Sequence, residues 1–235
     1  MKKKILKINE LLIDRFSIPA RPKKLPTPLD AIIGTILSQN TNDKNSYQAY
    51  RNLKDKFKNW DELAALKASQ IEKFIRVAGL GKQKSKAIYE LLQSLKKKHK
   101  IVSLDYIKNN SNEEILEELT SYNGVGVKTA SCVLLFSLGR NICPVDTHVH
   151  RTLNRIGLVK TNNAEKTFYE IIDMIPDGVA HSFHTNLIRL GREICKPANP
   201  NCLICPLLKI CKYEQKNLGV NKPQKKIDFM LLDNL

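Results

Sequence analysis

Apolar residues recur along the chain at the three- and four-residue spacing of helices. Between residues 82 and 98, alanine, isoleucine and leucine side chains fall on one helical face and lysines occupy the rest. Residues 29–38 form a compact apolar run after two prolines, and the apolar residues between 168 and 175 form a further helical face. No stretch alternates with the period of two that a half-buried strand requires. The pattern therefore predicts an all-α fold with short helices and short loops.

Polar residues mark where several of these helices begin. Ser69-x-x-Glu72 and Ser111-x-x-Glu114 each fit the capping box, in which the two side chains bond each other's backbone amides. Asp146 precedes another helical pattern, and Asp is a preferred residue at a helix N-cap. We therefore expect helices to begin at these three places.

The chain is strongly basic. Lys and Arg number 39 against 23 Asp and Glu, which gives a net charge of +16. This excess predicts attraction to polyanions, and nucleic acid is the leading candidate, although a lysine-rich composition alone would give the same count. The N-terminus lacks the apolar run of a secretory signal, and no segment approaches the roughly 18 apolar residues of a membrane span. We therefore expect a soluble, cytoplasmic protein with no membrane partner.

Four of the six cysteines lie close together near the C-terminal end. Their spacing is C-x6-C-x2-C-x5-C, and they are Cys195, Cys202, Cys205 and Cys211. Four thiolates so near in sequence can surround one metal centre, and both zinc and an iron–sulfur cluster accept four cysteines. Free thiols or a disulfide pair are the alternative. The other two, Cys132 and Cys143, stand in apolar surroundings that favour buried, unligated side chains.

The stretch 122–135, YNGVGVKTASCVLL, joins a tight Gly-Val-Gly turn to an apolar helix. It lacks the spacing of a phosphate-binding Walker A loop, and it follows a helical pattern rather than the strand of a dinucleotide-binding fingerprint. A helix, a tight hairpin and a second helix remain. In this arrangement the amides of Gly124, Val125 and Gly126 can hold a DNA phosphate without reading the base. An ordinary glycine C-cap between two helices is the alternative.

Three motifs in this order resemble the endonuclease III family, which are base-excision repair DNA glycosylases of the helix–hairpin–helix superfamily. They are the hairpin segment 124–130 (GVGVKTA), the segment 145–148 (VDTH) and the four-cysteine loop. The resemblance extends from about Pro28 to Cys211. It implies a six-helix domain with the hairpin, residues 28–138, and a second domain made of residues 1–27 plus 139–235. The second domain would hold a 4Fe–4S cluster on the four cysteines.

The resemblance also implies a reaction and its residues. Lys128 would be the nucleophile and Asp146 its acidic partner, in an enzyme that removes oxidised pyrimidines and nicks the strand through a lysine Schiff base. A lysine attacks only as the neutral amine, and the peptide dipoles at a helix start disfavour the ammonium form. The target nucleotide would be flipped out of the duplex, because its C1′ is inaccessible while stacked. A purely structural Lys128 at a helix end is the alternative.

Flipping leaves a gap in the duplex, and the resemblance assigns two loops to fill it. Leu80 would be the apolar plug, and Gln39 or Asn40 would probe the opposite strand. The alternatives are that Leu80 belongs to the core and that residues 39–43 merely end a helix. Two basic runs, Lys82/Lys84/Lys86 and Lys96–Lys98, could contact phosphate, but a run of charges is more often a solvated helix face, and we interpret them so.

Three other functions stay open at this point. A mismatch-specific uracil or thymine glycosylase would be expected to lack the lysine, and a non-catalytic DNA-binding module would need neither Lys128 nor Asp146. An electron-transfer iron–sulfur protein would explain neither the hairpin nor the basic charge. The expected partner is double-stranded DNA with a damaged base or abasic site, bound by a monomer. His148, beside Asp146, is expected to line the site or brace the backbone.

Overall fold

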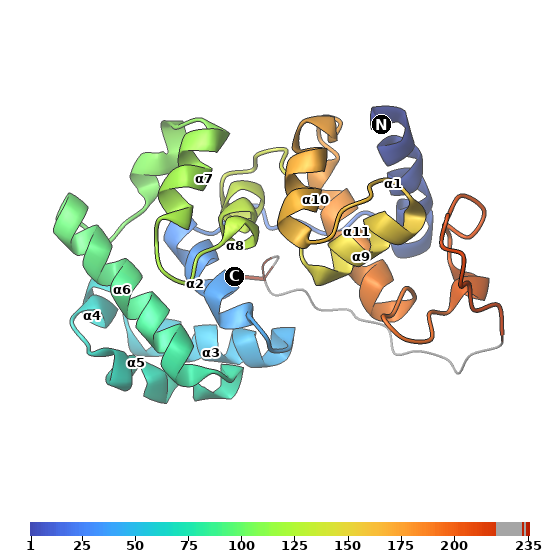
Figure 1. Ribbon diagram of the computed structural model, residues 1–235. Coiled ribbons are helices and arrows are strands. Elements are labelled where there is room, and N and C mark those ends of the chain that lie inside the picture. Colours follow the sequence, from blue (N-terminus) through green and yellow to red (C-terminus); the bar gives the residue numbers. More distant parts are fainter. Residues whose placement is uncertain (220–231, 233) are drawn as a thin grey trace. The chain divides into compact units, whose positions relative to one another are not determined.

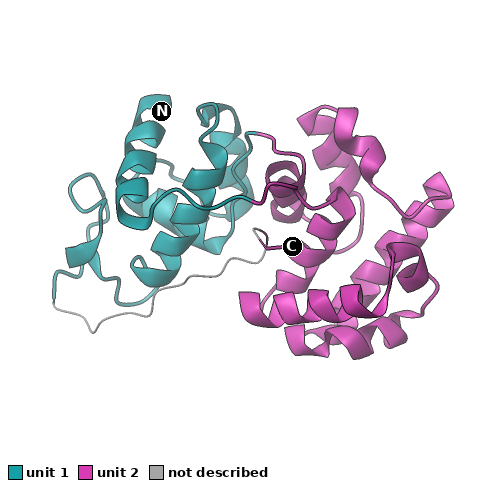
Figure 2. Cartoon of the chain, turned by 180° about the vertical axis from the view of Figure 1, so that it is seen from behind, with its two compact units in different colours: residues 1–21, 141–228 teal, residues 22–140, 229–235 magenta. Residues whose placement is uncertain are grey.

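The computed structural model of the chain describes residues 1–219, 232, 234 and 235, so the rest of the predicted 139–235 segment lies outside the described residues. All of its regular elements are helical in this described part, which confirms the predicted all-α fold (Figure 1). The described residues divide into two compact units, shown in separate colours in Figure 2. Unit 1 holds residues 1–21 and 141–219, and unit 2 holds residues 22–140 and the last three described residues.

Unit 2 is built around helix α2, and its elements are α2 (Pro28–Ser38), α3 (Asp43–Lys56), α4 (Trp60–Ala64), α5 (Ala68–Ile75), η1 (Arg76–Ala78), α6 (Gly81–His99), η2 (Asp105–Asn109), α7 (Asn112–Thr120), α8 (Val127–Cys132) and η3 (Val133–Ser137). Every residue of α2 from Pro28 to Leu37 is buried. Apolar residues lie on all sides of α2, so the helix is buried, and it packs against α3, α6 and α8. The compact apolar run in the sequence is therefore the central helix of this unit.

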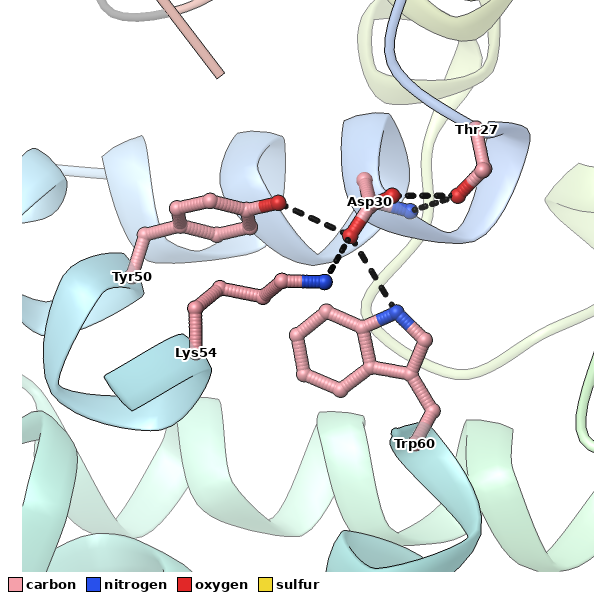
Figure 3. A network of polar contacts seen from close by, with 5 residues as sticks. All are labelled: Thr27, Asp30, Tyr50, Lys54 and Trp60. Atoms are coloured by element: carbon pink, nitrogen blue, oxygen red, sulfur yellow. Dashed lines mark hydrogen bonds and ion pairs between the residues drawn. The ribbon is translucent and has the colours of Figure 1, made fainter. Parts of the chain in front are cut away.

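A buried carboxylate ties three helices of unit 2 together (Figure 3). Asp30, 9 % exposed, accepts hydrogen bonds from Thr27 and Tyr50 hydroxyls, from the Trp60 indole nitrogen and from the Lys54 ammonium. Burial alone raises the pKa of Asp30, but the hydrogen bonds and the nearby ammonium outweigh it, and the pKa lies below its ordinary value. The Asp30 carboxylate is fully hydrogen-bonded, and the folded protein therefore stabilises the ionised form of Asp30.

Replacing Asp30 by asparagine is expected to lower the free energy of unfolding by about 1–3 kcal/mol at neutral pH, the range for a disrupted buried hydrogen-bond group. Because the folded-state pKa is lowered, the contribution of Asp30 is present above its unfolded pKa and lost as the pH falls through the folded value. Urea unfolding of wild type and Asp30→Asn, followed by fluorescence of Trp60, the only tryptophan, checks this at several pH values. Asp55→Asn removes an exposed carboxylate of the same unit and serves as control. A gap between wild type and Asp30→Asn that stays constant down to acid pH contradicts the assignment.

Unit 1 joins the first helix to the later ones, and its elements are α1 (Lys2–Phe16), α9 (Thr147–Ile156), α10 (Ala164–Ile171), η4 (Ile172–Met174), α11 (Ala180–Glu193) and η5 (Cys202–Ile204). Helix α11 packs against both α1 and α9, and α9 also contacts α10. Ser17 accepts through its carbonyl a hydrogen bond from the Asn186 side chain, which fixes the end of α1 on α11. None of the described helices combines the length and apolar character needed to cross a bilayer.

One of the two predicted capping boxes is confirmed and the other is wrong. At α7, the Ser111 amide donates to Glu114 and the Glu114 amide donates back to the Ser111 hydroxyl. Helix α5 instead begins at Ala68, because the Lys67 amide donates to the Gln70 side chain and extends the helix beyond Ser69. Gln fills the same N3 role as Glu, so the neighbouring Ser69-x-x-Glu72 pattern is coincidental.

Candidate functional site

The hairpin between α7 and α8 requires glycine at its first position. Gly124 has a φ of +79°, a backbone conformation that side-chain-bearing residues rarely adopt. A Cβ atom there would lie 2.8 Å from the Cβ of Ala87 on α6, too close for any contact without a shift. The turn is closed by the Val125 amide, which donates to the Tyr122 carbonyl over 3.1 Å. Glycine thus allows the hairpin to turn tightly while lying against α6.

The second hairpin glycine leaves the start of α8 without a side-chain cap. Gly126 is the N-cap of α8 and offers no side-chain cap for the amides that follow it. The first amides of a helix have no intrahelical partner and carry the positive end of the helix dipole. A Cβ at Gly126 would meet nothing within 4 Å, and Gly124 and Gly126 are both exposed, whereas the Val125 side chain is buried. The hairpin therefore presents backbone donors rather than side chains.

Three polar contacts hold the hairpin in place. The Tyr122 hydroxyl donates to Glu118 over 2.7 Å, and the Asn123 side chain donates to Glu90 on α6 over 2.7 Å. From the loop after α2, the Gln39 side chain donates to the Gly124 carbonyl over 3.1 Å. The Tyr-Asn pair before the first glycine is thus part of the hairpin's anchorage.

The two predicted reactive residues each stand at a helix start. Lys128 is the second residue of α8 and half-buried. Asp146 is the N-cap of α9, where its Oδ1 accepts from the Val149 amide over 2.8 Å, and it is half-buried as well. The prediction of Asp146 as an N-cap is confirmed. Lys128 belongs to unit 2 and Asp146 to unit 1.

Two histidines support the segment that carries Asp146. His184 on α11 is buried, and its Nδ1 donates to the Pro144 carbonyl over 2.9 Å. His148 packs on the backbone of α11, where a Cβ at Gly191 would lie 2.8 Å from its own Cβ. Burial lowers the pKa of His148 and Arg151 lies 3.2 Å from its Nδ1, so the neutral imidazole is favoured. Within unit 1, His148 therefore braces one helix against another.

The two predicted DNA-filling loops present different side chains. Leu80 is 49 % exposed with a φ of +50°, so it does not belong to the core. Asn40 is exposed and also adopts a positive φ, +49°, whereas the Gln39 side chain is bound to the hairpin. Leucine rarely adopts a positive φ, and this turn holds its side chain out in solvent. Of the two polar candidates, Asn40 is the one whose side chain faces solvent.

The four clustered cysteines line one pocket of unit 1, together with Arg155, Ile194, Pro200, Leu208, Tyr213 and Lys216. Burial raises the pKa of the Cys195 thiol and raises that of Cys205 to about 12. Within the described residues, no group of three or more His, Cys, Asp or Glu side chains is placed to hold a metal ion. Cys132 and Cys143, predicted as buried hydrophobes, are indeed buried away from this pocket.

Arg155 is a functional candidate that sequence reasoning missed. Its guanidinium donates to the Cys195 sulfur over 3.5 Å and to the carbonyls of Lys196 and Pro197, and it stacks over the Tyr213 ring at 4.3 Å. It thereby fixes both ends of the cysteine loop. Two of its partners are backbone carbonyls about forty residues further along the chain, and such contacts leave no local signal in the sequence.

Comparison with known proteins finds a protein family and several relatives that the chain resembles in sequence. Residues 33–176 match the family described as HhH-GPD superfamily base excision DNA repair protein. The endonuclease III of Thermotoga maritima is 33% identical over 196 residues, covering 83% of this chain and 88% of that protein. The endonuclease III of Rickettsia prowazekii is 34% identical over 182 residues, covering 77% and 82%. A protein of Arabidopsis thaliana named as a candidate DNA glycosylase is 36% identical, and the chain spans 62% of its length.

Solved structures share the same fold. An endonuclease III–DNA complex, described as a trapped covalent intermediate, has a TM-score of 0.74 at 26% identity and covers 90% of this chain and 96% of its own. A thermostable thymine-DNA glycosylase has a TM-score of 0.73 at 20% identity, covering 91% and 98%, and is similar in fold alone. The likeness extends over both units of the chain.

Proposed function

The chain belongs to the endonuclease III family of helix–hairpin–helix DNA glycosylases, and we propose that it removes oxidised pyrimidines from duplex DNA and then nicks the strand as an AP lyase. The observation that carries this proposal is a lysine, Lys128, placed directly after a hairpin that presents bare helix-start amides. A DNA phosphate held by those amides brings the adjacent sugar toward that lysine. The net charge of +16 supports binding along the duplex.

The reaction begins at the sugar of the flipped nucleotide. The neutral Lys128 amine attacks C1′, the bond from C1′ to the base breaks, and the base leaves with the bonding electrons and takes up a proton. Asp146 stabilises the positive charge that grows on the sugar and accepts the proton released by the lysine. The sugar ring then opens to a Schiff base with Lys128, a C2′ proton is lost, and the 3′ phosphate leaves. This last step is the β-elimination that nicks the strand.

A covalent intermediate is the feature that separates this chemistry from simple hydrolysis. A related endonuclease III is described as a trapped covalent intermediate with DNA, and a covalent bond to DNA requires a nucleophile on the protein. Leu80 and Asn40 are proposed to fill the gap left by the flipped nucleotide, one as an apolar plug and the other against the opposite base. Their exposure supports these roles.

The four cysteines are proposed to hold a 4Fe–4S cluster. Their thiols fit such a group because all four line one pocket, and cysteine thiolates are the usual ligands of iron–sulfur clusters. The spacing C-x6-C-x2-C-x5-C matches the cluster loop of the endonuclease III family, and this favours a cluster over zinc. Arg155 would hold the loop against α9 and donate to the Cys195 sulfur. When bound, the cluster supplies a structural cross-link for the cysteine loop.

Loss of one cysteine is expected to reduce the bound iron. Protein purified without oxygen should be brown, contain iron and acid-labile sulfide, and lose most of both in Cys205→Ser, because a thiolate ligand is replaced by a weak hydroxyl. Iron analysis and visible absorption measure this. Cys143→Ala removes a buried cysteine outside the pocket and should keep the wild-type iron content. One zinc per chain and no iron would overturn the cluster assignment.

The proposed activity is tested on a panel of duplexes that each carry one thymine glycol, uracil, thymine–guanine mispair or abasic site. We expect strand nicking at thymine glycol and at the abasic site without added alkali. Base release that yields a nick only after hot alkali would mean a monofunctional glycosylase instead. Binding without base release on any duplex would mean a non-catalytic DNA-binding module.

A further inference from the structure

Unit 2 contains a lysine whose side chain is buried. Lys84 lies on α6 and is 1 % exposed, although it stands between two other lysines in the sequence. The interpretation of this run as a solvated helix face is therefore wrong at its middle residue. Burial lowers the pKa of Lys84 to about 8, and among the described residues no carboxylate offsets that burial. A buried ammonium must be held by hydrogen-bond acceptors, and an apolar residue at this place would leave those acceptors without the bonds.

The Lys84 ammonium connects the two points of the backbone at which the loops proposed to enter DNA begin. Its Nζ donates to the Leu37 carbonyl over 2.8 Å and to the Ala78 carbonyl over 2.8 Å. Leu37 lies in the last turn of α2, immediately before the loop with Asn40. Ala78 ends η1 and immediately precedes the turn with Leu80. One side chain thus links two loops that are about forty residues apart in sequence.

The chemistry of the two acceptors suits this link. Both carbonyls stand at the C-terminal ends of helical segments, where carbonyl groups lack partners and carry partial negative charge. An ammonium has three donors and no acceptor, so it can bind both carbonyls at once. Lys84 also continues α6 from the turn itself, since its own amide donates to the Leu80 carbonyl over 3.0 Å. The side chain and the backbone of one residue therefore fix both loops.

We propose that Lys84 is a positioning residue that sets the separation of the Leu80 and Asn40 loops, so that both enter the duplex together when a nucleotide is flipped. The plug and the probe must occupy one gap at the same time, and a loop displaced by about 1 Å loses much of its effect. This inference rests on the proposed function. A residue that served stability alone would change the melting temperature without changing how the protein distinguishes damaged from intact DNA.

The test compares wild type with Lys84→Met, which is nearly as long and removes the ammonium together with its two hydrogen bonds. Two quantities are measured: the ratio of affinities for a duplex with a tetrahydrofuran abasic analogue and for the intact duplex, and the fluorescence of 2-aminopurine placed opposite the analogue. We expect Lys84→Met to lower the affinity ratio by about tenfold, the effect of losing roughly one strong hydrogen bond, and to reduce the fluorescence rise on binding. Affinity for the intact duplex should stay within about twofold, since phosphate contacts are unaffected.

Control variants separate the possible outcomes. Lys56→Met, which removes an exposed lysine on α3, should match wild type in both measurements. Lys84→Gln, with a shorter donor, replaces Lys84→Met if that variant fails to fold, and should give an intermediate loss. An unchanged affinity ratio and fluorescence, with only a lower melting temperature, would overturn the positioning role. A wild-type protein that neither prefers the abasic analogue nor raises the fluorescence would instead overturn the proposed function, and this inference with it.

Discussion

Replacing Lys128 by glutamine is expected to abolish the covalent adduct that borohydride traps on duplex DNA carrying one thymine glycol. The amine that forms the Schiff base is gone, and glutamine has no nucleophilic nitrogen. Strand nicking should fall by roughly 10³–10⁶-fold, the range seen when a covalent nucleophile is removed. Gel shift of the trapped adduct, with mapping of the modified peptide in wild type, measures the effect.

The fold and DNA affinity of Lys128→Gln should stay close to wild type, because the residue lies at a half-buried helix start and its side chain is not part of the core. The matched control is Lys166→Gln, which replaces an exposed lysine on α10. This variant should form as much of the borohydride-trapped adduct as wild type does. Full trapping by Lys128→Gln, or an adduct that maps to another lysine, would remove Lys128 from the proposed reaction.

Replacing Asp146 by asparagine is expected to lower the rate of base release by about 10²–10⁴-fold, since both charge stabilisation and proton acceptance are lost. The folded structure should be nearly unaffected, because asparagine caps a helix as well as aspartate does. The Val149 amide keeps an oxygen acceptor in the same place. Single-turnover base release on the thymine glycol duplex, together with the melting temperature, measures both quantities.

A second cap provides the matched control for this substitution. Asn163 caps α10, where its side-chain oxygen accepts from the Lys166 amide over 2.8 Å. Asn163→Asp makes the reverse exchange at an exposed cap and should leave base release unchanged. Equal activity of Asp146→Asn and wild type would leave Asp146 with a capping role alone.

Much of the helical framework could be predicted from residue pattern. Segment 82–98 was expected as a helix and is α6, because its apolar face and its lysines repeat with the helical period. The apolar pattern between residues 168 and 175 predicted a helix that runs further than the observed one. Helix α10 stops at Ile171, Ile172 starts a short 3₁₀ turn, and Ile175 is extended before a proline, which disfavours helical backbone at the preceding residue.

The candidate site could be predicted where a local motif defines it and not where distant carbonyls do. The hairpin glycines and the Asp146 cap follow from turn and capping chemistry that neighbouring residues impose. Lys84 cannot be distinguished in the sequence from the lysines beside it, because one of its partners is 47 residues away and both are backbone atoms. Only the fold decides which lysine of the run is buried.

Unit 1 unites the first helix with the last ones, and this imposes an order on biosynthesis. Helix α1 leaves the ribosome before its partner α11, which ends at Glu193 and follows residues 22–140 of unit 2 in the chain. At translation rates of about 5–20 residues per second, α1 waits roughly 10–35 s before it can pack. Unit 2 is contiguous up to residue 140 and is free to fold during that interval. The cysteine loop emerges later still. Any metal centre that it holds is therefore assembled after residues 22–140 of unit 2 have been synthesised.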